Sequence, residues 1–270
     1  MSNKKKVRIL VADEYYALEV GPETIPISGY KVQSFIGGAT ELCVTLIGTA
    51  NDLELENCLG CKEGRKSYKA ADLDTFWRGQ KNIVLLDPNI TACKDWKELF
   101  QQLIDSGAWV DFSQGVDIRL MTEEKAEMIK RIRTKNIHFA WDRYGDREEV
   151  IAKFRMFQEL TGWGHRKMTV YVLTNFDTTH EQDLERVYTL RDLGFTPYVM
   201  VYNKGDFVLH DKKGKPMKRK PMGELLEKYT EGQIRHFAKC WDLQRWVNNR
   251  VIFRSCDRFG DYKGRVKGCS

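Results

Sequence analysis

Five apolar, strand-like segments follow one another at a near-constant spacing, and this spacing constrains the fold more than any other feature of the sequence. The segments read IVLLD, WVDF, IHFAWD, MTVYVLTNF and TPYVMVYN, and they begin at Ile83, Trp109, Ile137, Met168 and Thr196. Successive starts lie about 26 to 31 residues apart, which leaves room for one strand, one helix and two loops in each repeat. The pattern predicts a series of βα units with parallel strands.

Amphipathic segments with helical periodicity fill the intervals between these strands. The sequence predicts helices over residues 95–105, 122–133, 147–160, 181–193 and 231–250. Thr122 is the expected N-cap of the second helix, although Lys125 stands where a capping box would have a glutamate. Before the first repeat, residues 42–48 predict another buried strand, and the prolines and glycines of residues 21–38 predict loops and edge pieces.

The composition is that of an ordinary globular protein, with 42% hydrophobic and 30% charged residues among 270. A chain of this length buries a full core as a single α/β barrel domain. No run of about 18 apolar residues occurs, so no transmembrane helix is expected. The first apolar stretch covers only residues 7–12 and is followed by Asp13 and Glu14, which argues against a signal peptide. These features predict a cytoplasmic protein without a membrane partner.

Basic charge is concentrated in residues 211–220, DKKGKPMKRK, where six basic side chains accompany one acidic side chain. This run lies within a polar stretch, residues 206–222, that is expected to be a flexible insertion. One interpretation is a solvated loop, and the other is an electrostatic footprint for RNA, DNA or a phosphorylated ligand. No aromatic residue interleaves with the lysines, so stacking of single-stranded bases on this segment is not supported.

Polar side chains follow each predicted strand at its carboxyl end. The first three strands are followed by Asp87 and Asn89, by Gln114, Asp117 and Arg119, and by Asp142. The last two are followed by Thr174, Asn175 and Asp177, and by Tyr202 and Asn203. Strands must end in turns, so each single residue is also explained as a turn residue. Because the carboxyl ends of parallel strands meet at one rim, the whole set predicts a ligand site there.

Two of the seven cysteines, Cys58 and Cys61, have the spacing of a CxxC metal or cluster ligand pair. Two thiolates do not complete a site, and Cys43 and then Cys93 are the nearest further thiols. The alternative is that these are unrelated loop cysteines. A thioredoxin-like redox pair is less favoured, because no strand and helix flank the motif. The five histidines show no metal-binding spacing and are interpreted as structural or surface residues.

From residue 62 to residue 203, and again over residues 245–253, the chain resembles radical S-adenosylmethionine (radical SAM) proteins of a subgroup common in bacteria and phages. The matching strings are KEGRKSYK, NIVLLDPNITACKDW, VDFSQGVDIRLMTEEKA, IHFAWDR, VYVLTNFDTTHEQDLERV, GFTPYVMVYN and RWVNNRVIF. The resemblance implies an α/β fold, a partial TIM-like (βα)6 barrel of parallel strands, over residues 62–253. Residues 1–61 would carry the first strands and the cysteine loop, and residues 254–270 would form an unstructured tail.

The resemblance also implies cofactors and the residues that hold them. Such proteins bind a [4Fe–4S] cluster on three cysteines and S-adenosylmethionine on its open iron, and they generate a 5′-deoxyadenosyl radical. Here the metal ligands would be Cys58, Cys61 and Cys43. The turn with Asp87 and Asn89 occupies the place where the family contacts the methionine amino group. Gln114, Asp117, Arg119 and Asp142 would face the cofactor or the substrate, which the sequence does not identify.

The cysteine loop departs from the family pattern, C-x3-C-x2-C, because Glu54 stands where the first cysteine would fall. Three explanations compete: a cluster on Cys43, Cys58 and Cys61 in unusual spacing, a degenerate relative that kept the barrel and lost the cluster, or a segment 21–61 altered by a reading-frame error. With the cluster, the chain is a radical SAM enzyme that takes electrons from a flavodoxin or ferredoxin. Without the cluster, one alternative is a barrel that binds a partner such as nucleic acid through residues 212–220. Another alternative is a protein that holds a structural zinc ion on the same three cysteines.

Overall fold

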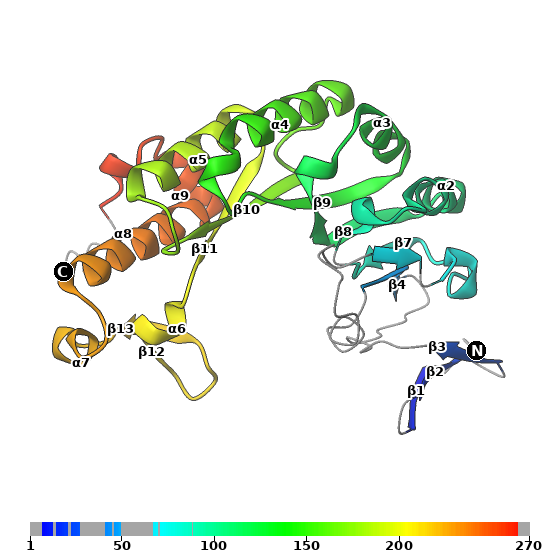
Figure 1. Ribbon diagram of the computed structural model, residues 1–270, viewed down its shortest axis with the longest axis horizontal. Coiled ribbons are helices and arrows are strands. Elements are labelled where there is room, and N and C mark those ends of the chain that lie inside the picture. The colour runs from blue at the N-terminus through cyan, green and yellow to red at the C-terminus, as the bar shows by residue number, and fades with distance from the viewer. Residues whose placement is uncertain are drawn as a thin grey trace, which may run out of the picture. The chain divides into compact units, whose positions relative to one another are not determined.

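The computed structural model describes residues 7–12, 15–20, 23–27, 41–44, 46–49, 67–69, 71–87 and 89–263. Its main feature is one sheet of six parallel strands in the order β11-β10-β9-β8-β7-β4 (Figure 1). The strands are β4 (Glu41–Val44), β7 (Asn82–Leu85), β8 (Trp109–Val116), β9 (Thr134–Ala140), β10 (Met168–Thr174) and β11 (Thr196–Val201). Neighbours in the sheet are successive in the chain from β7 to β11, as a series of βα units requires.

Helices alternate with these strands. They are α2 (Trp96–Ser106), α3 (Glu123–Arg131), α4 (Arg147–Thr161), α5 (His180–Asp192), α8 (Glu231–Val247) and α9 (Arg250–Ser255). Helix α3 begins as its sequence predicts, because the Thr122 hydroxyl accepts a hydrogen bond from the Lys125 N–H at 3.2 Å. The predicted α/β fold of parallel strands with alternating helices is confirmed.

Three small antiparallel sheets accompany the large one. Strands β1 (Val7–Ala12), β2 (Tyr15–Val20) and β3 (Glu23–Ile27) form a meander. Strands β5 (Ile47–Thr49) and β6 (Ser67–Lys69) pair with each other, and β12 (Val208–His210) pairs with β13 (Pro216–Arg219). The single strand predicted over residues 42–48 is therefore wrong, since the structure divides this stretch between β4 and β5. In residues 21–38, where loops and edge pieces were predicted, the structure has the edge strand β3.

Burial alternates along most of the large sheet, so in the described part of the chain one face of the strands is more closely covered than the other. In β4, β7 and β10 every second residue is buried and its neighbours are partly exposed. The buried positions contact helices: Phe112 packs on Phe100 of α2, and Phe139 packs on Phe154 of α4, with ring centroids 6.3 and 5.6 Å apart. Sheets with helices on both faces show apolar residues at every position instead. The interior of a closed βα barrel is filled by layers of side chains, whereas here the second face of these strands is partly exposed. We call this second face of the strands the open face.

The chain divides into two compact units: residues 1–138 with 159–162, and residues 139–158 with 163–270. The second unit has a core of aromatic rings. Phe139 lies 5.2 Å from Phe157 and 6.1 Å from Phe195, measured between ring centroids. A further cluster joins the strands to the last long helix through Val187, Val199, Leu243, Trp246 and Val247.

The last predicted helix, residues 231–250, ends at Val247 because its next residue serves another element. The Asn248 side chain accepts a hydrogen bond from the Val199 N–H at 2.8 Å and donates one to the Val199 carbonyl at 2.9 Å. These bonds satisfy the backbone of edge strand β11, which would otherwise be open to pairing with another chain. Asn249 then caps α9 by accepting from the Val251 and Ile252 N–H groups.

The basic stretch, residues 206–222, carries regular structure. Between α6 (Lys204–Phe207) and α7 (Met222–Leu226) lies the β12–β13 hairpin, which Figure 1 shows in yellow. Its turn is held by Asp211, which accepts from the Lys213 and Lys215 N–H groups at 2.8 Å. The lysines of the hairpin are exposed. Whether the hairpin moves as a flexible insertion stays a prediction.

Residues 256–262 fold back onto the second unit, so the expectation of an unstructured tail is wrong for this part. The Trp246 indole donates a hydrogen bond to the Cys256 carbonyl at 3.0 Å, and the Phe259 N–H donates to the Tyr188 hydroxyl at 2.9 Å. Among the helices in the described part of the chain, none combines the length and the apolar character that crossing a bilayer requires.

Candidate functional site

At the carboxyl ends of β4, β7 and β8, in the first unit, predicted site residues form a chain of hydrogen bonds. The buried Asp87 carboxylate accepts from the Leu46 N–H at 2.7 Å and so joins the ends of β4 and β7. The Asn89 amide oxygen accepts from the Thr91 hydroxyl at 2.6 Å and from the Asp117 N–H at 3.4 Å, which joins the ends of β7 and β8. These residues therefore fix the rim of the sheet, whatever else they bind.

Asp117 and Arg119 form a local ion pair on the same rim. The Asp117 carboxylate accepts from the Arg119 backbone N–H and Nε, both at 3.0 Å, and from Nη2 at 2.8 Å. Burial alone raises the pKa of the Asp117 carboxyl, but the hydrogen bonds from Arg119 outweigh burial and hold this pKa below its ordinary value. The pair presents a carboxylate and a guanidinium side by side.

We expect Arg119→Ala to lower stability only at a pH where Asp117 is ionised. Because the folded-state pKa of Asp117 is lowered, the pair stabilises the fold above the unfolded-state pKa of about 4 and stops doing so as the pH falls through the folded-state value. Arg119 is exposed, so the expected difference in the free energy of unfolding at pH 7 is only about 0.5 kcal/mol. Urea unfolding of both proteins at pH 7 and pH 2.5 measures it, and an undiminished difference at the lower pH would contradict the assignment.

Gln114 and Asp142 lie apart from this chain of hydrogen bonds. Gln114 is exposed and lies inside β8, which runs to Val116 and does not end at Phe112 as the sequence suggests. Gly115, with a φ of +103°, breaks the alternation there, and a Cβ at this position would lie 3.6 Å from the His138 carbonyl oxygen. Asp142 follows β9, belongs to the second unit, and has an exposed side chain.

Of the three predicted metal ligands, Cys58 and Cys61 lie outside the described residues. Cys43 lies in β4 between the buried Leu42 and Val44, and is itself half-buried on the open face. Its register partner is Val84 in β7, and the partner of Val84 in β8 is Asp111. Cys43 and Asp111 therefore occupy one row across the open face.

Three polar side chains of the first unit gather on this open face, and sequence reasoning missed all of them. The Asn136 amide donates to Asp111 Oδ2 at 2.8 Å, and His138 Nδ1 lies 3.0 Å from the Phe112 carbonyl oxygen and 3.9 Å from Asp111 Oδ1. We call Asp111, Asn136 and His138 the polar row. The signal was present in the sequence, because Asn136 and His138 alternate with the apolar Ile137 and Phe139.

A carboxylate in a strand normally has its hydrogen bonds satisfied. Asp111 Oδ1 is buried and has no hydrogen-bond partner among the described residues, although His138 approaches it. Such an unsatisfied group costs stability, and groups of this kind cluster at functional sites. The polar row therefore offers a carboxylate, an amide and an imidazole to a polar ligand on the open face.

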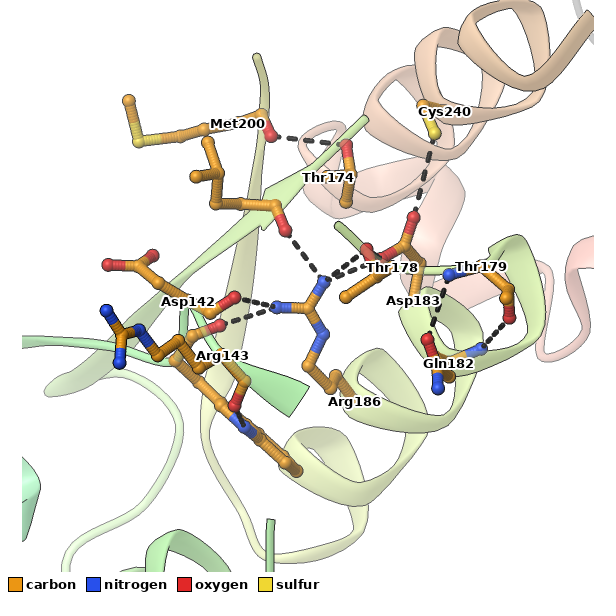
Figure 2. Close-up of polar contacts among 12 residues, drawn as sticks. Asp142, Arg143, Thr174, Thr178, Thr179, Gln182, Asp183, Arg186, Met200 and Cys240 are labelled. Carbon is orange, nitrogen blue, oxygen red and sulfur yellow. Dashed lines mark hydrogen bonds and ion pairs between the residues drawn. The ribbon is translucent and has the colours of Figure 1, made fainter. Parts of the chain in front are cut away.

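In the second unit, a fully buried arginine holds the strand ends in place (Figure 2). From helix α5, Arg186 Nη1 donates to the Trp141 carbonyl at 2.7 Å and the Asp142 carbonyl at 3.2 Å. Its Nη2 donates to the Leu173 carbonyl at 2.7 Å and to Asp183 Oδ1 at 2.6 Å. The carbonyls that end β9 and β10 thus depend on one side chain. We call this arrangement the arginine clip.

Comparison with known proteins assigns no family. A scan against protein-family models found no matching model, and a search of curated proteins found no match. Solved structures that align with the chain include SuiB of Streptococcus suis, alone, bound to S-adenosylmethionine and bound to its precursor peptide SuiA. Each is 12% identical, with TM-scores of 0.36, 0.37 and 0.36, and covers 65%, 65% and 64% of this chain. The alignments span 39%, 39% and 37% of SuiB, well under two thirds of its length.

Proposed function

We propose that the chain is a radical SAM enzyme, with a [4Fe–4S] cluster on Cys58, Cys61 and Cys43 and S-adenosylmethionine bound at the open face of the first unit. The observation that carries this proposal is the polar row. Two of its residues, Asp111 of β8 and His138 of β9, lie within the strings VDFSQGVDIR and IHFAWDR that resemble radical SAM proteins. Folds built from βα units hold their ligands at the carboxyl ends of the strands, where Asp87, Asn89 and Asp117 lie.

One of the proposed cluster ligands, Cys43, lies in the described part of the chain, and its thiol supports the proposal. Thiolates are the protein ligands of iron–sulfur clusters, and Cys43 offers its thiol on the same face, and in the same row, as Asp111. When bound, the cluster supplies the electron for reductive cleavage of S-adenosylmethionine, chemistry that belongs to the cofactors and not to the protein. A flavodoxin or ferredoxin is the expected source of that electron.

The protein's own part is to bind and orient. S-adenosylmethionine carries an ammonium group, a carboxylate and a sulfonium cation, so its site must offer both charges. The Asp111 carboxylate suits a cationic group, and the Asp117–Arg119 pair presents a carboxylate and a guanidinium at the rim. The Asn136 amide holds Asp111 in its orientation by donating to Oδ2, which lowers the cost of ordering the site when ligand binds.

The proposal is tested by iron, sulfide and visible absorption after anaerobic reconstitution. We expect about four irons per chain and a brown protein, with the cluster lost in Cys58→Ala and Cys61→Ala. The half-buried Cys256 provides a matched control, since Cys256→Ser should keep the full iron content. A colourless, folded wild-type protein would contradict the proposal. It would favour a cluster-free binding protein, with the exposed lysines of the β12–β13 hairpin as the first surface to examine.

A further inference from the structure

We propose that Asp183, His236 and Cys240 form a zinc site between α5 and α8. The site lies wholly in the second unit and is independent of the cysteines assigned to the cluster. His236 and Cys240 are four residues apart on α8, so their side chains lie on one face of that helix. Asp183 reaches them from the first turn of α5. Figure 2 shows the contact between Cys240 and Asp183.

The distances between the three ligand atoms are close to those of a zinc tetrahedron. Cys240 Sγ lies 3.4 Å from His236 Nε2 and 3.6 Å from Asp183 Oδ2. Zinc bonds of usual length to sulfur, nitrogen and oxygen give tetrahedral edges of about 3.4 to 3.6 Å. All three atoms lie within 4.8 Å of one another, so a small rotation of the half-buried His236 ring closes the remaining edge. A thiolate, an imidazole and a carboxylate together favour zinc over calcium or magnesium.

The surroundings hold the ligands in place. Asp183 Oδ1 accepts from Arg186 Nη2 and from the Thr178 hydroxyl, both at 2.6 Å, which leaves Oδ2 directed at the Cys240 thiol. Ligating carboxylates in metal sites are fixed by such outer hydrogen bonds. The Arg186 cation also repels a second cation, so we expect binding weaker than in sites made of cysteines alone.

The same geometry argues against a nucleophilic role for Cys240. Its side chain is fully buried, and burial, followed by the nearby Asp183 charge, raises the pKa of the thiol to about 12. A nucleophilic cysteine needs access to substrate and a lowered pKa. The Asn175 N–H also faces the sulfur, and a donor of this kind stabilises a metal-bound thiolate.

The test uses the full chain carrying Cys58→Ala and Cys61→Ala, which removes the competing thiol pair. Metal is stripped with a chelator, the protein is loaded with Zn²⁺, and bound zinc is counted after gel filtration. We expect about one zinc per chain, as for a single structural site. His236→Ala and Cys240→Ser should each lower the amount of zinc bound per chain at least fivefold. His210→Ala and Cys256→Ser, which remove the same chemical groups elsewhere in the second unit, should leave it unchanged.

Two further measurements separate a site from adventitious binding. Zinc in 100-fold excess over its Kd should raise the Tm of the parent by about 5 °C and leave that of His236→Ala unchanged. Cobalt in place of zinc should give a sulfur-to-metal charge-transfer band that Cys240→Ser lacks. If the parent retains no zinc, the three residues form only a hydrogen-bonded cluster and the proposal is wrong. It is equally wrong if His236→Ala retains zinc at the parent's stoichiometry, and this variant decides the matter even if Cys240→Ser does not fold.

Discussion

Replacing Arg186 with methionine is expected to lower the free energy of unfolding by about 3 to 5 kcal/mol. Both Arg186 and Asp183 are fully buried, so removal of the cation leaves an uncompensated carboxylate in the interior. The carbonyls of Trp141 and Leu173 would also lose a donor at 2.7 Å each. Urea unfolding of wild type and variant measures the loss.

The surface pair between Arg147 of α4 and Glu185 of α5 provides the control. The Arg147 Nε lies 2.6 Å from Glu185 Oε1, but both side chains are more than a third exposed, at 41% and 38%. Arg147→Met should therefore change stability by less than about 1 kcal/mol. Adding Asp183→Leu to Arg186→Met should recover part of the loss, because the buried charge is then removed while the carbonyls stay without a donor. A loss below about 1 kcal/mol in Arg186→Met would show that the arginine clip is not needed.

Replacing Asp111 with asparagine is expected to weaken S-adenosylmethionine binding at least tenfold while leaving the free energy of unfolding unchanged or higher by up to about 1 kcal/mol. The substitution keeps the shape of the side chain and removes the charge that the proposed site offers to a cationic group. It also removes a buried carboxylate oxygen that lacks a hydrogen-bond partner in the described part of the chain. Residues kept for function at a cost in stability behave in this way.

Equilibrium dialysis of the reconstituted protein measures the binding, and urea unfolding measures the stability. Glu149→Gln makes the same change of carboxylate to amide at an exposed position of α4, and it should alter neither quantity. If Asp111→Asn binds S-adenosylmethionine like wild type and unfolds more easily, Asp111 is a structural residue and the polar row is not the binding site.

The order of helices and strands could be predicted from the sequence because it depends on local patterns of residues. The start of α3 rests on Thr122 alone, and the strands rest on short apolar runs separated by helix-length intervals. The end of α8 could not be predicted, because Asn248 bonds to Val199, which lies far away in the chain. The extension of β8 was missed for a similar reason: Ser113 to Gly115 resemble a turn, and Gly115 stays in the strand with a positive φ.

The candidate site was predicted only where it depends on strand ends. Asp87, Asn89 and Asp117 were expected at one rim, and the structure joins that rim by their hydrogen bonds; their binding of a ligand stays a prediction. The arginine clip was not foreseen, since Arg186 bonds to main-chain carbonyls that carry no side-chain signature. Asp183, His236 and Cys240 were missed because sequence spacing relates only the two residues on α8.

Because burial alternates along a strand, two different kinds of selection act on neighbouring residues of the same segment. In β10, Val170 and Val172 are packed against helices and tolerate only residues of similar volume and polarity, whatever the protein does. Tyr171 and Leu173 alternate with them on the open face, where, under the proposed function, contact with a ligand decides which residue is kept. Relatives that share the fold but differ in substrate should therefore agree at Val170 and Val172 and diverge at Tyr171 and Leu173. The first pair then reflects common descent, and the second pair reflects specialisation.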